Sequence, residues 1–333
     1  MSAGSPSGAQ AGAGAVVATD SGSPSGAGAL HVKVTVIGAG LIGCAWAALF
    51  ARAGHDVVLF DLDEAALDRV DGVVRTLLAD LDALDAIERV STSGDLAAAV
   101  READYVQECV PEVASIKAEV FARIAEHAPA DAILASSTSA LMPSLFTAEV
   151  PGRERTLVAH PFNPPHLHTA VELVPAPWTS AEAIGRARAI LESAGMEPIE
   201  LREELDGFVV NRLQAAVLHE AFRLVASGAV SAQDVDNAVI GALAPRWSVL
   251  GVFGTIDLNA PEGIAQYVER YEELYQRLGA AQTETVDWQR VLDGGLLAQR
   301  EQTWPRAELD AKRAWRDRQL VELARAKRAR ETG

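Results

Sequence analysis

A histidine and a glutamate, separated by a turn rich in proline, are the residues best suited to chemistry in this sequence. His160 begins HPFNPP, and Glu172 lies in VELVP, twelve residues further on. An imidazole titrates near neutral pH, so it can take the proton of an alcohol while hydride leaves the carbon. A carboxylate on the other ring nitrogen would fix the tautomer and stabilise the imidazolium. The pair predicts the base of a dehydrogenase; a loop histidine and an exposed strand glutamate are the alternative.

A second motif offers a place for a cofactor. VTVIGAGLIG has Gly38, Gly40 and Gly43 between a strand-like and a helix-like run. Such glycines allow a tight turn, the approach of a pyrophosphate and close packing of helix on strand. Asp61, at the end of the next strand-like run, would accept hydrogen bonds from the ribose hydroxyls and repel a 2′-phosphate. The sequence predicts NAD, bound by Asp61 and by Gly38, Gly40, Leu41, Ile42 and Gly43.

These residues need a sheet whose strands bring them together. Short runs rich in β-branched residues alternate with helix-like segments from His31 to about Leu205. The expected strands are 32–37, 57–61, 105–110, 132–138, 156–160, 170–175 and 197–201. This alternation predicts an α/β fold with a Rossmann-type, mostly parallel sheet covered on both faces. His160 and Glu172 would then lie on adjacent strands.

The pattern changes after residue 205. Residues 206–228 are predicted to form one long helix that Asp206 caps and Gly228 ends. The rest is expected to be helical, and its last helix, 306–330, mixes basic and acidic residues as a solvated face or a subunit contact would. The predicted parts are a disordered Gly/Ala/Ser/Pro extension at 1–30, an NAD-binding domain at 31–205 and an all-helical C-terminal domain at 206–333.

Bulk properties limit the partners and the compartment. The chain of 333 residues has a formal net charge of −17, which argues against nucleic acid or an anionic membrane surface as a partner. No apolar run is expected to reach the length of a membrane span. Two cysteines, Cys44 and Cys109, fit a reducing, cytoplasmic compartment without disulfides. The first thirty residues lack the basic and apolar regions of a signal peptide, so none is expected.

Several motifs occur in the order found in one group of dehydrogenases. They are GAGLIG, ECVPE, SSTS, HPFNPP, VELVP and GFVVNRL. With them the sequence resembles the 3-hydroxyacyl-CoA dehydrogenase superfamily from about residue 31 to the C-terminus. SSTSALMPS, the pair Arg246–Trp247, LNAPEG and AWRD make it more similar to the λ-crystallin/L-gulonate 3-dehydrogenase branch. The resemblance implies an NAD-dependent oxidoreductase that forms a homodimer through its helical domain.

The resemblance also implies roles for individual side chains. His160 would be the general base and Glu172 its partner. Ser139 and Asn211 would hydrogen-bond the reacting hydroxyl or carbonyl oxygen. Asn163 would support the pocket beside His160.

By the same resemblance, Glu112 and Lys117 would lie near the nicotinamide ribose. From the residues alone, Lys117 could equally be a solvated helix residue. Ser139 could instead form a local turn, and Asn211 could be a helix residue bonded to its own backbone. Both interpretations are compatible with the sequence.

The substrate is the least constrained feature of the sequence. Coenzyme A carries several phosphates, whereas residues 61–85 contain eight acidic residues and two arginines and would repel it. Arg246 lies where CoA-acting relatives tend to have an uncharged Pro-Met stretch, and an arginine forks well onto a carboxylate. We therefore expect a small free hydroxy acid such as L-gulonate. Arg246 would clamp its carboxylate from the same chain or across a dimer; a surface ion pair is the alternative.

Other functions fit parts of the sequence. One is a true 3-hydroxyacyl-CoA dehydrogenase, and another is a crystallin-like structural or NAD-sensing protein. A third is an L-carnitine dehydrogenase, since Trp247, Phe253 and Phe162 could wall a trimethylammonium group. His166 and His168 replace aromatic residues that the branch usually has after Asn-Pro-Pro. Two histidines so spaced make a poor ligand set, so no metal is expected.

Overall fold

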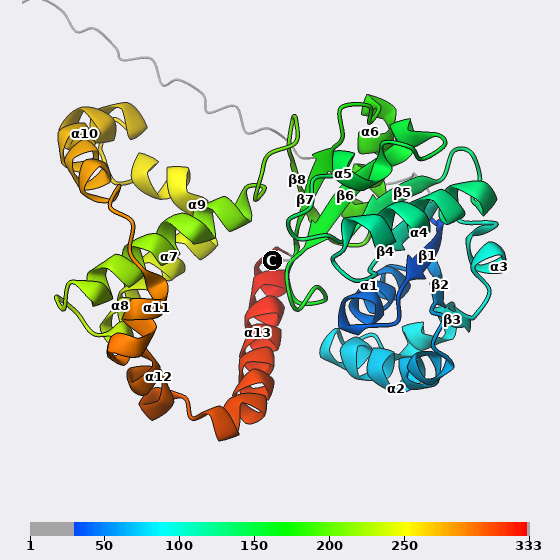
Figure 1. The fold of residues 1–333 in the computed structure, drawn as a ribbon, viewed down its shortest axis with the longest axis horizontal. Coiled ribbons are helices and arrows are strands. Elements are labelled where there is room, and N and C mark those ends of the chain that lie inside the picture. The colour runs from blue at the N-terminus through cyan, green and yellow to red at the C-terminus, as the bar shows by residue number, and fades with distance from the viewer. Residues whose placement is uncertain (1–29, 332–333) are drawn as a thin grey trace, which may run out of the picture. The chain divides into compact units, whose positions relative to one another are not determined.

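The computed structural model describes residues 30–331, so nearly all of the extension predicted at 1–30 lies outside the described residues. Residues from His31 onward belong to one unit. The domain boundary expected near residue 205 therefore stays a prediction. The sheet, however, ends before that residue, and the described chain after it is helical (Figure 1).

Eight strands in the described residues make one sheet, in the order β3-β2-β1-β4-β5-β6-β7-β8. Their bounds are β1 Lys33–Ile37, β2 Asp56–Phe60, β3 Val90–Ser93, β4 Tyr105–Glu108, β5 Ile133–Ser136, β6 Thr156–Pro161, β7 Ala170–Pro175 and β8 Glu197–Glu200. Only β6 and β7 pair in antiparallel fashion among these described strands, so the predicted mostly parallel sheet is confirmed. The strand β3 was not predicted, because VSTS at the sheet edge has little apolar character.

Helices cover both faces of this sheet (Figure 1). One face packs against α1 Leu41–Arg52, α2 Glu64–Asp80 and α6 Ala181–Ser193, and the other against α3 Leu96–Val100, α4 Ala114–His127 and α5 Ser144–Thr147. Successive strand residues alternate between the faces, as Leu157 and Val158 do. His160 therefore shares the face of Val158, which is also the face of Val174 and hence of Glu172. The two candidate catalytic side chains lie on the same side of the sheet.

The remaining described elements are helical, as predicted. The α-helices among them are α7 Val210–Ala226, α8 Ala232–Ala238, α9 Ala244–Asp257, α10 Ile264–Ala281, α11 Trp288–Val291, α12 Leu297–Thr303 and α13 Leu309–Glu331. The cap predicted at Asp206 is wrong: α7 begins at Val210, because Gly207 and Phe208 have φ of 73° and 50° and cannot continue a helix. Gly228, with φ of 73°, follows the helix end as predicted.

One helical stretch corrects the expectation about apolar runs. Ala232–Asp257 is long and apolar enough, by length and composition, to cross a membrane; an 18-residue window within it has a mean hydropathy of 1.4 and is 6% buried. The run is easily overlooked in the sequence because Arg246 interrupts it. It also bends at Gly251, whose φ of 68° and ψ of −171° are not helical. Apolar helices in the cores of soluble proteins have the same composition. The exposure of this apolar surface is therefore what indicates a binding partner.

Candidate active site

His160 and Glu172 face one another across the antiparallel pair β6–β7. The two residues are direct partners in the strand register. His160 Nδ1 lies 2.7 Å from Glu172 Oε2, and Glu172 is completely buried. The contact predicted from the sequence is therefore confirmed, and the alternative of an exposed strand glutamate is wrong.

The second oxygen of Glu172 holds the start of α7. Glu172 Oε1 accepts hydrogen bonds from the backbone N–H groups of Val209, at 2.7 Å, and Val210, at 2.9 Å. Burial acts to raise the pKa of Glu172, but the hydrogen bonds from His160, Val210 and Val209 together lower it. The group is thus a carboxylate that can only accept, so the neutral form of the His160 ring has its proton on Nδ1 and an acceptor at Nε2. Glu172 also does the capping that the sequence assigned to Asp206.

Aromatic rings pack on the imidazole. The rings of Phe162 and Phe208 lie 4.8 and 5.6 Å from that of His160, centroid to centroid. Phe162 belongs to the turn between β6 and β7, which also contains a cis peptide bond between Asn163 and Pro164. Asn163 itself is exposed. This turn forms one wall beside the candidate base.

Ser139 and Asn211, which the resemblance assigned to the reacting oxygen, are in contact. The Asn211 side-chain amide donates to the backbone oxygen of Ser139 at 2.7 Å. The alternative, in which the Asn211 side chain bonds to the backbone of its own helix, is therefore wrong for this N–H. It directly follows Val210, whose N–H binds Glu172. The buried glutamate thus connects His160 to the segment that carries Asn211.

Lys117 is 1% exposed, so the interpretation as a solvated helix residue is wrong. Its ammonium lies 2.9 and 3.1 Å from the two oxygens of Glu108 and 3.4 Å from Glu112 Oε2. Glu112 in turn accepts from the Thr138 hydroxyl and from Ser139 N–H. Glu112 and Lys117 therefore meet and support the backbone of Ser139. Their place near the nicotinamide ribose stays a prediction.

Glu108 is a member of this cluster that the sequence analysis missed. It is completely buried at the end of β4 and also accepts from the Ser136 hydroxyl and from Val110 N–H, both at 2.6 Å. Burial raises its pKa, against the lowering effect of Lys117. Its signal was present as the first acid of ECVPE, but a buried strand glutamate cannot be told from an exposed one by spacing.

The glycine-rich loop has the geometry that a dinucleotide needs. Gly38 has φ of 110°, in the left-handed region. A Cβ at Gly43 would lie 1.9 Å from the Gly38 oxygen, so only glycine lets α1 pack there. A Cβ at Gly40 would meet nothing in the described residues, which leaves the helix start open to a ligand. Leu41 is 82% exposed there, and Ile42 is half-buried.

Asp61 is tied to the same loop. Its Oδ2 accepts from Ala39 N–H at 2.7 Å, and its Oδ1 accepts from Asp63 N–H at 3.0 Å. The site lies where the strand order turns from β1 to β4, the crevice in which such sheets bind ligands. These residues fit NAD, with the pyrophosphate at the start of α1 and a ribose at Asp61. Among the described residues, no group of three or more His, Cys, Asp and Glu side chains could hold a metal ion.

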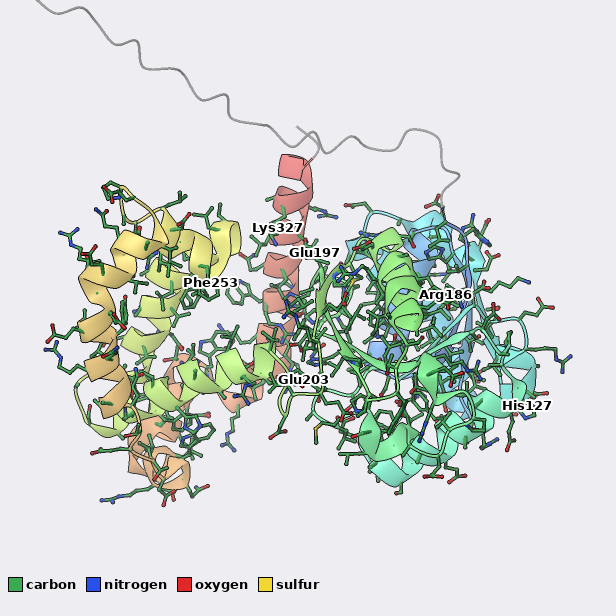
Figure 2. All side chains as sticks on the ribbon, turned by 90° about the horizontal axis from the view of Figure 1, so that it is seen from above. His127, Arg186, Glu197, Glu203, Phe253 and Lys327 are labelled. Carbon is green, nitrogen blue, oxygen red and sulfur yellow. The ribbon has the colours of Figure 1, made fainter. Side chains whose placement is uncertain are left out.

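Arg246 is not brought to His160 by any hydrogen bond or ion pair found in the described residues. It lies exposed on α9, and its Nε donates to the Ala242 oxygen at 3.0 Å. It lines a cavity of about 750 Å³ with Trp247 and the tyrosines of α10, Tyr267, Tyr271 and Tyr275. Phe253, labelled in Figure 2, is 75% exposed on α9. None of the four catalytic candidates lines this cavity.

Comparison with known protein families identifies the family of this chain. Residues 33–204 match the NAD binding domain of 3-hydroxyacyl-CoA dehydrogenase, and residues 207–301 match its C-terminal domain. The chain belongs to the 3-hydroxyacyl-CoA dehydrogenase family. It is therefore an NAD-dependent oxidoreductase acting on CH–OH groups.

Within this family the chain falls in the λ-crystallin branch. It is 38% identical over 312 residues to the lambda-crystallin homolog of Bos taurus, over 88% of this chain and 95% of that protein. It is 36% identical over 241 residues to the L-carnitine dehydrogenase of Bacillus cereus, over 71% of this chain and 74% of that one. A similar solved structure is that of 5-formyl-3-hydroxy-2-methylpyridine 4-carboxylic acid 5-dehydrogenase, an NAD⁺ dependent dismutase. It has a TM-score of 0.78 and 27% identity, over 89% of this chain and 98% of that one.

Proposed function

We propose that this protein oxidises the 3-hydroxyl of a small free hydroxy acid in an L-gulonate 3-dehydrogenase-like reaction. The buried contact of 2.7 Å between His160 and Glu172 carries the proposal. With its proton held on Nδ1, His160 uses Nε2 to take the hydroxyl proton, and Glu172 stabilises the imidazolium that results. Bound NAD supplies the acceptor for the hydride.

Ser139 and Asn211 would orient the reacting oxygen. The amide of Asn211 has one N–H engaged with the Ser139 backbone, which leaves a second N–H for a ligand. The Ser139 side chain is exposed, and its backbone is fixed by Glu112. A donor held in advance stabilises the oxygen without reorganisation during the reaction.

The charge around α2 favours a free acid over an acyl-CoA. Residues 61–85 contain eight acidic residues and two arginines. Most of these carboxylates are exposed, because Val70, Val74 and Leu78 take the buried face of α2. Exposed carboxylates repel a polyphosphate within roughly a Debye length of 8–10 Å. The CoA ester is therefore the weaker alternative.

The helical segment supports a homodimer in which Arg246 acts across the interface. In the described residues of α7, α10 and α12 no side chain is buried, and α9 buries only Thr255. Exposed apolar surface on that scale favours a second copy as its cover. Since Arg246 lies on this segment, the dimer offers a route by which its guanidinium could reach a substrate carboxylate.

L-carnitine is a second candidate substrate, favoured by one contact and one relative. The ring of Phe162 packs 4.8 Å from that of His160 and could face a trimethylammonium group. One of the relatives is an L-carnitine dehydrogenase. The other walls suggested for such a cage, Trp247 and Phe253, lie on α9 and would have to come from the dimer as Arg246 would.

Parallel assays of NADH formation separate these substrates. L-gulonate, L-carnitine and 3-hydroxybutyryl-CoA are compared by kcat/KM at matched concentrations. We expect a free hydroxy acid to be turned over best; a preference for the CoA ester would refute the proposal. Arg246→Ala should raise KM for an acid about 10–100-fold, whereas Arg277→Ala, an exposed arginine on α10, should leave it unchanged.

Mixed dimers test whether Arg246 acts in trans. His160→Ala and Arg246→Ala are each assayed at an acid concentration below KM, then unfolded together and refolded at equal amounts. If the arginine serves the other subunit, each mixed dimer has one intact site and the mixture regains about a quarter of the wild-type rate. No gain over the separate variants would place Arg246 in the site of its own chain or outside catalysis.

A further inference from the structure

Helix α13 (Leu309–Glu331), red in Figure 1, lies beyond residue 301, where the second family model ends. From the sequence it was a solvated face or a subunit contact. Val321 on this helix is buried to 7% exposure within the chain itself. The contacts of α13 with the sheet domain point to a further role.

An arginine fork anchors α13 to the end of α2. Arg325 Nη2 and Nε lie 2.6 and 3.0 Å from the two carboxylate oxygens of Asp82. Asp82 directly follows the C-cap of α2, Leu81, which is buried. Hydrogen bonding and charge from Asp82 raise the pKa of Arg325. A two-point contact of this kind fixes orientation as well as distance.

Beside this anchor, the β6–β7 turn meets the end of α2. His166 of the turn is buried, and its Nε2 lies 3.5 Å from Asp80 Oδ2 of α2. Neither ring nitrogen of His166 has a hydrogen bond of normal geometry in the described residues. Burial lowers the pKa of His166, while Asp80 and Asp317 of α13 act to raise it. The imidazole is therefore held by packing beside the end of α2 rather than by hydrogen bonds within the turn.

The second histidine of the turn is His168. Burial lowers the pKa of His168, as do the charges of Arg316 and Lys327 on α13, while a hydrogen bond to the Asn163 backbone raises it. The anchor of α13 at Asp82 thus lies two residues from Asp80, the α2 residue that contacts the turn.

This turn shapes the space beside the base without holding the base itself. It carries Phe162, which packs on His160, and Asn163. His160 is fixed separately by its strand register and by Glu172. A shift of the turn should therefore alter how a substrate fits, and leave the tautomer of His160 and the NAD site unchanged.

We propose that α13 is a strap that positions the β6–β7 turn, with Arg325 and Asp82 as its anchor, and so sets the substrate-facing positions of Phe162 and Asn163. Its effect on substrate choice rests on the proposed function. Its effect on the turn does not, and is measurable without any substrate. Arg325, Asp82 and His166 are positioning residues in this scheme.

Hydrogen exchange of residues 162–169 in the NAD-free protein is the primary test. The variants are Arg325→Glu, Asp82→Arg and the charge swap that combines them. Reversal is chosen because both partners are about half exposed and loss of an exposed pair shifts little. Asp82 has φ of 57°, so the single variant Asp82→Arg measures the backbone cost of arginine there. Arg313→Glu is the control, since Arg313 pairs with Asp310 within α13.

We expect Arg325→Glu to speed exchange in the turn about tenfold, to raise KM for the substrate, and to leave the Kd for NAD unchanged. The swap should return exchange toward the wild-type rate beyond the sum of the single effects. Unchanged exchange in Arg325→Glu, an equal effect of Arg313→Glu, or a swap no better than additive would each overturn the strap. If no hydroxy acid is oxidised at all, the proposed function fails, while the exchange data still decide the strap.

Discussion

Replacing Glu172 with glutamine tests the assignment of the base most directly. The carboxylate accepts from His160 Nδ1 on one oxygen and from Val209 and Val210 on the other. Glutamine has the same shape but one donor end. If its oxygen keeps the two backbone N–H groups, its NH₂ faces Nδ1 and forces the ring proton onto Nε2. If the amide turns round, its NH₂ meets those two N–H donors instead.

In the first arrangement His160 can no longer accept a proton at Nε2. The loss should equal the whole contribution of a general base, about 10²–10⁴ in kcat. At 1.36 kcal/mol per tenfold, this is about 3–5 kcal/mol of activation free energy. The Kd for NAD should not change, because Asp61 and the glycine loop share no hydrogen bond with Glu172 in the described residues.

The assay is the initial rate of NADH formation at saturating substrate, with NAD affinity measured by calorimetry. Rates are compared well below the melting temperature, since hydrogen bonds to a buried charge stabilise by about 1.5–3 kcal/mol each. Glu200→Gln is the matched control, a glutamate on the neighbouring strand β8 that pairs with Arg188 at the surface. A variant at Glu172 that keeps kcat within about threefold of wild type, with NAD bound, would show that His160 is not the base.

Three further predictions concern Lys117, Asp61 and His166. Lys117→Met should destabilise the protein by about 3–5 kcal/mol in denaturant titration, because it leaves the buried carboxyl of Glu108 without its cation; adding Glu108→Gln should recover most of this, and additive losses would contradict the pairing. Asp61→Asn should raise the Kd for NAD about 10–100-fold by calorimetry; an unchanged Kd would place the ribose elsewhere. Since burial lowers the pKa of His166 below 6.5 despite Asp80, it contributes stability that is fully present above pH 6.5 and lost as pH falls toward the lowered pKa. His166→Gln should flatten that pH slope of the free energy of unfolding, and a slope that persists would assign it to other groups.

Periodicity and composition were enough to predict seven of the eight strands in the described residues and the contact between His160 and Glu172. Runs rich in β-branched residues locate strands because such side chains suit a pleated, half-buried surface. The spacing of His160 and Glu172 then places them opposite one another once a short turn joins their strands. The sequence analysis missed the strand β3 and the buried role of Glu108 for one reason. The sequence pattern of a short strand does not show whether a polar side chain faces solvent or, as Glu108 does, a buried lysine.

The start of α7 shows why the remaining errors are tertiary in origin. Asp206 has the residue type and the position of a helix cap, and local rules favour it. In the fold, Gly207 and Phe208 turn the chain, and the N–H groups of the first helical turn meet Glu172, which comes from a strand far away in the sequence. Because the buried carboxylate of Glu172 accepts from both the start of α7 and the His160 imidazole, the position of each depends on the other. Protonating Glu172, or moving α7, should therefore cost activity and stability together. No local pattern could predict this dependence, because it exists only when the two strands and the helix meet.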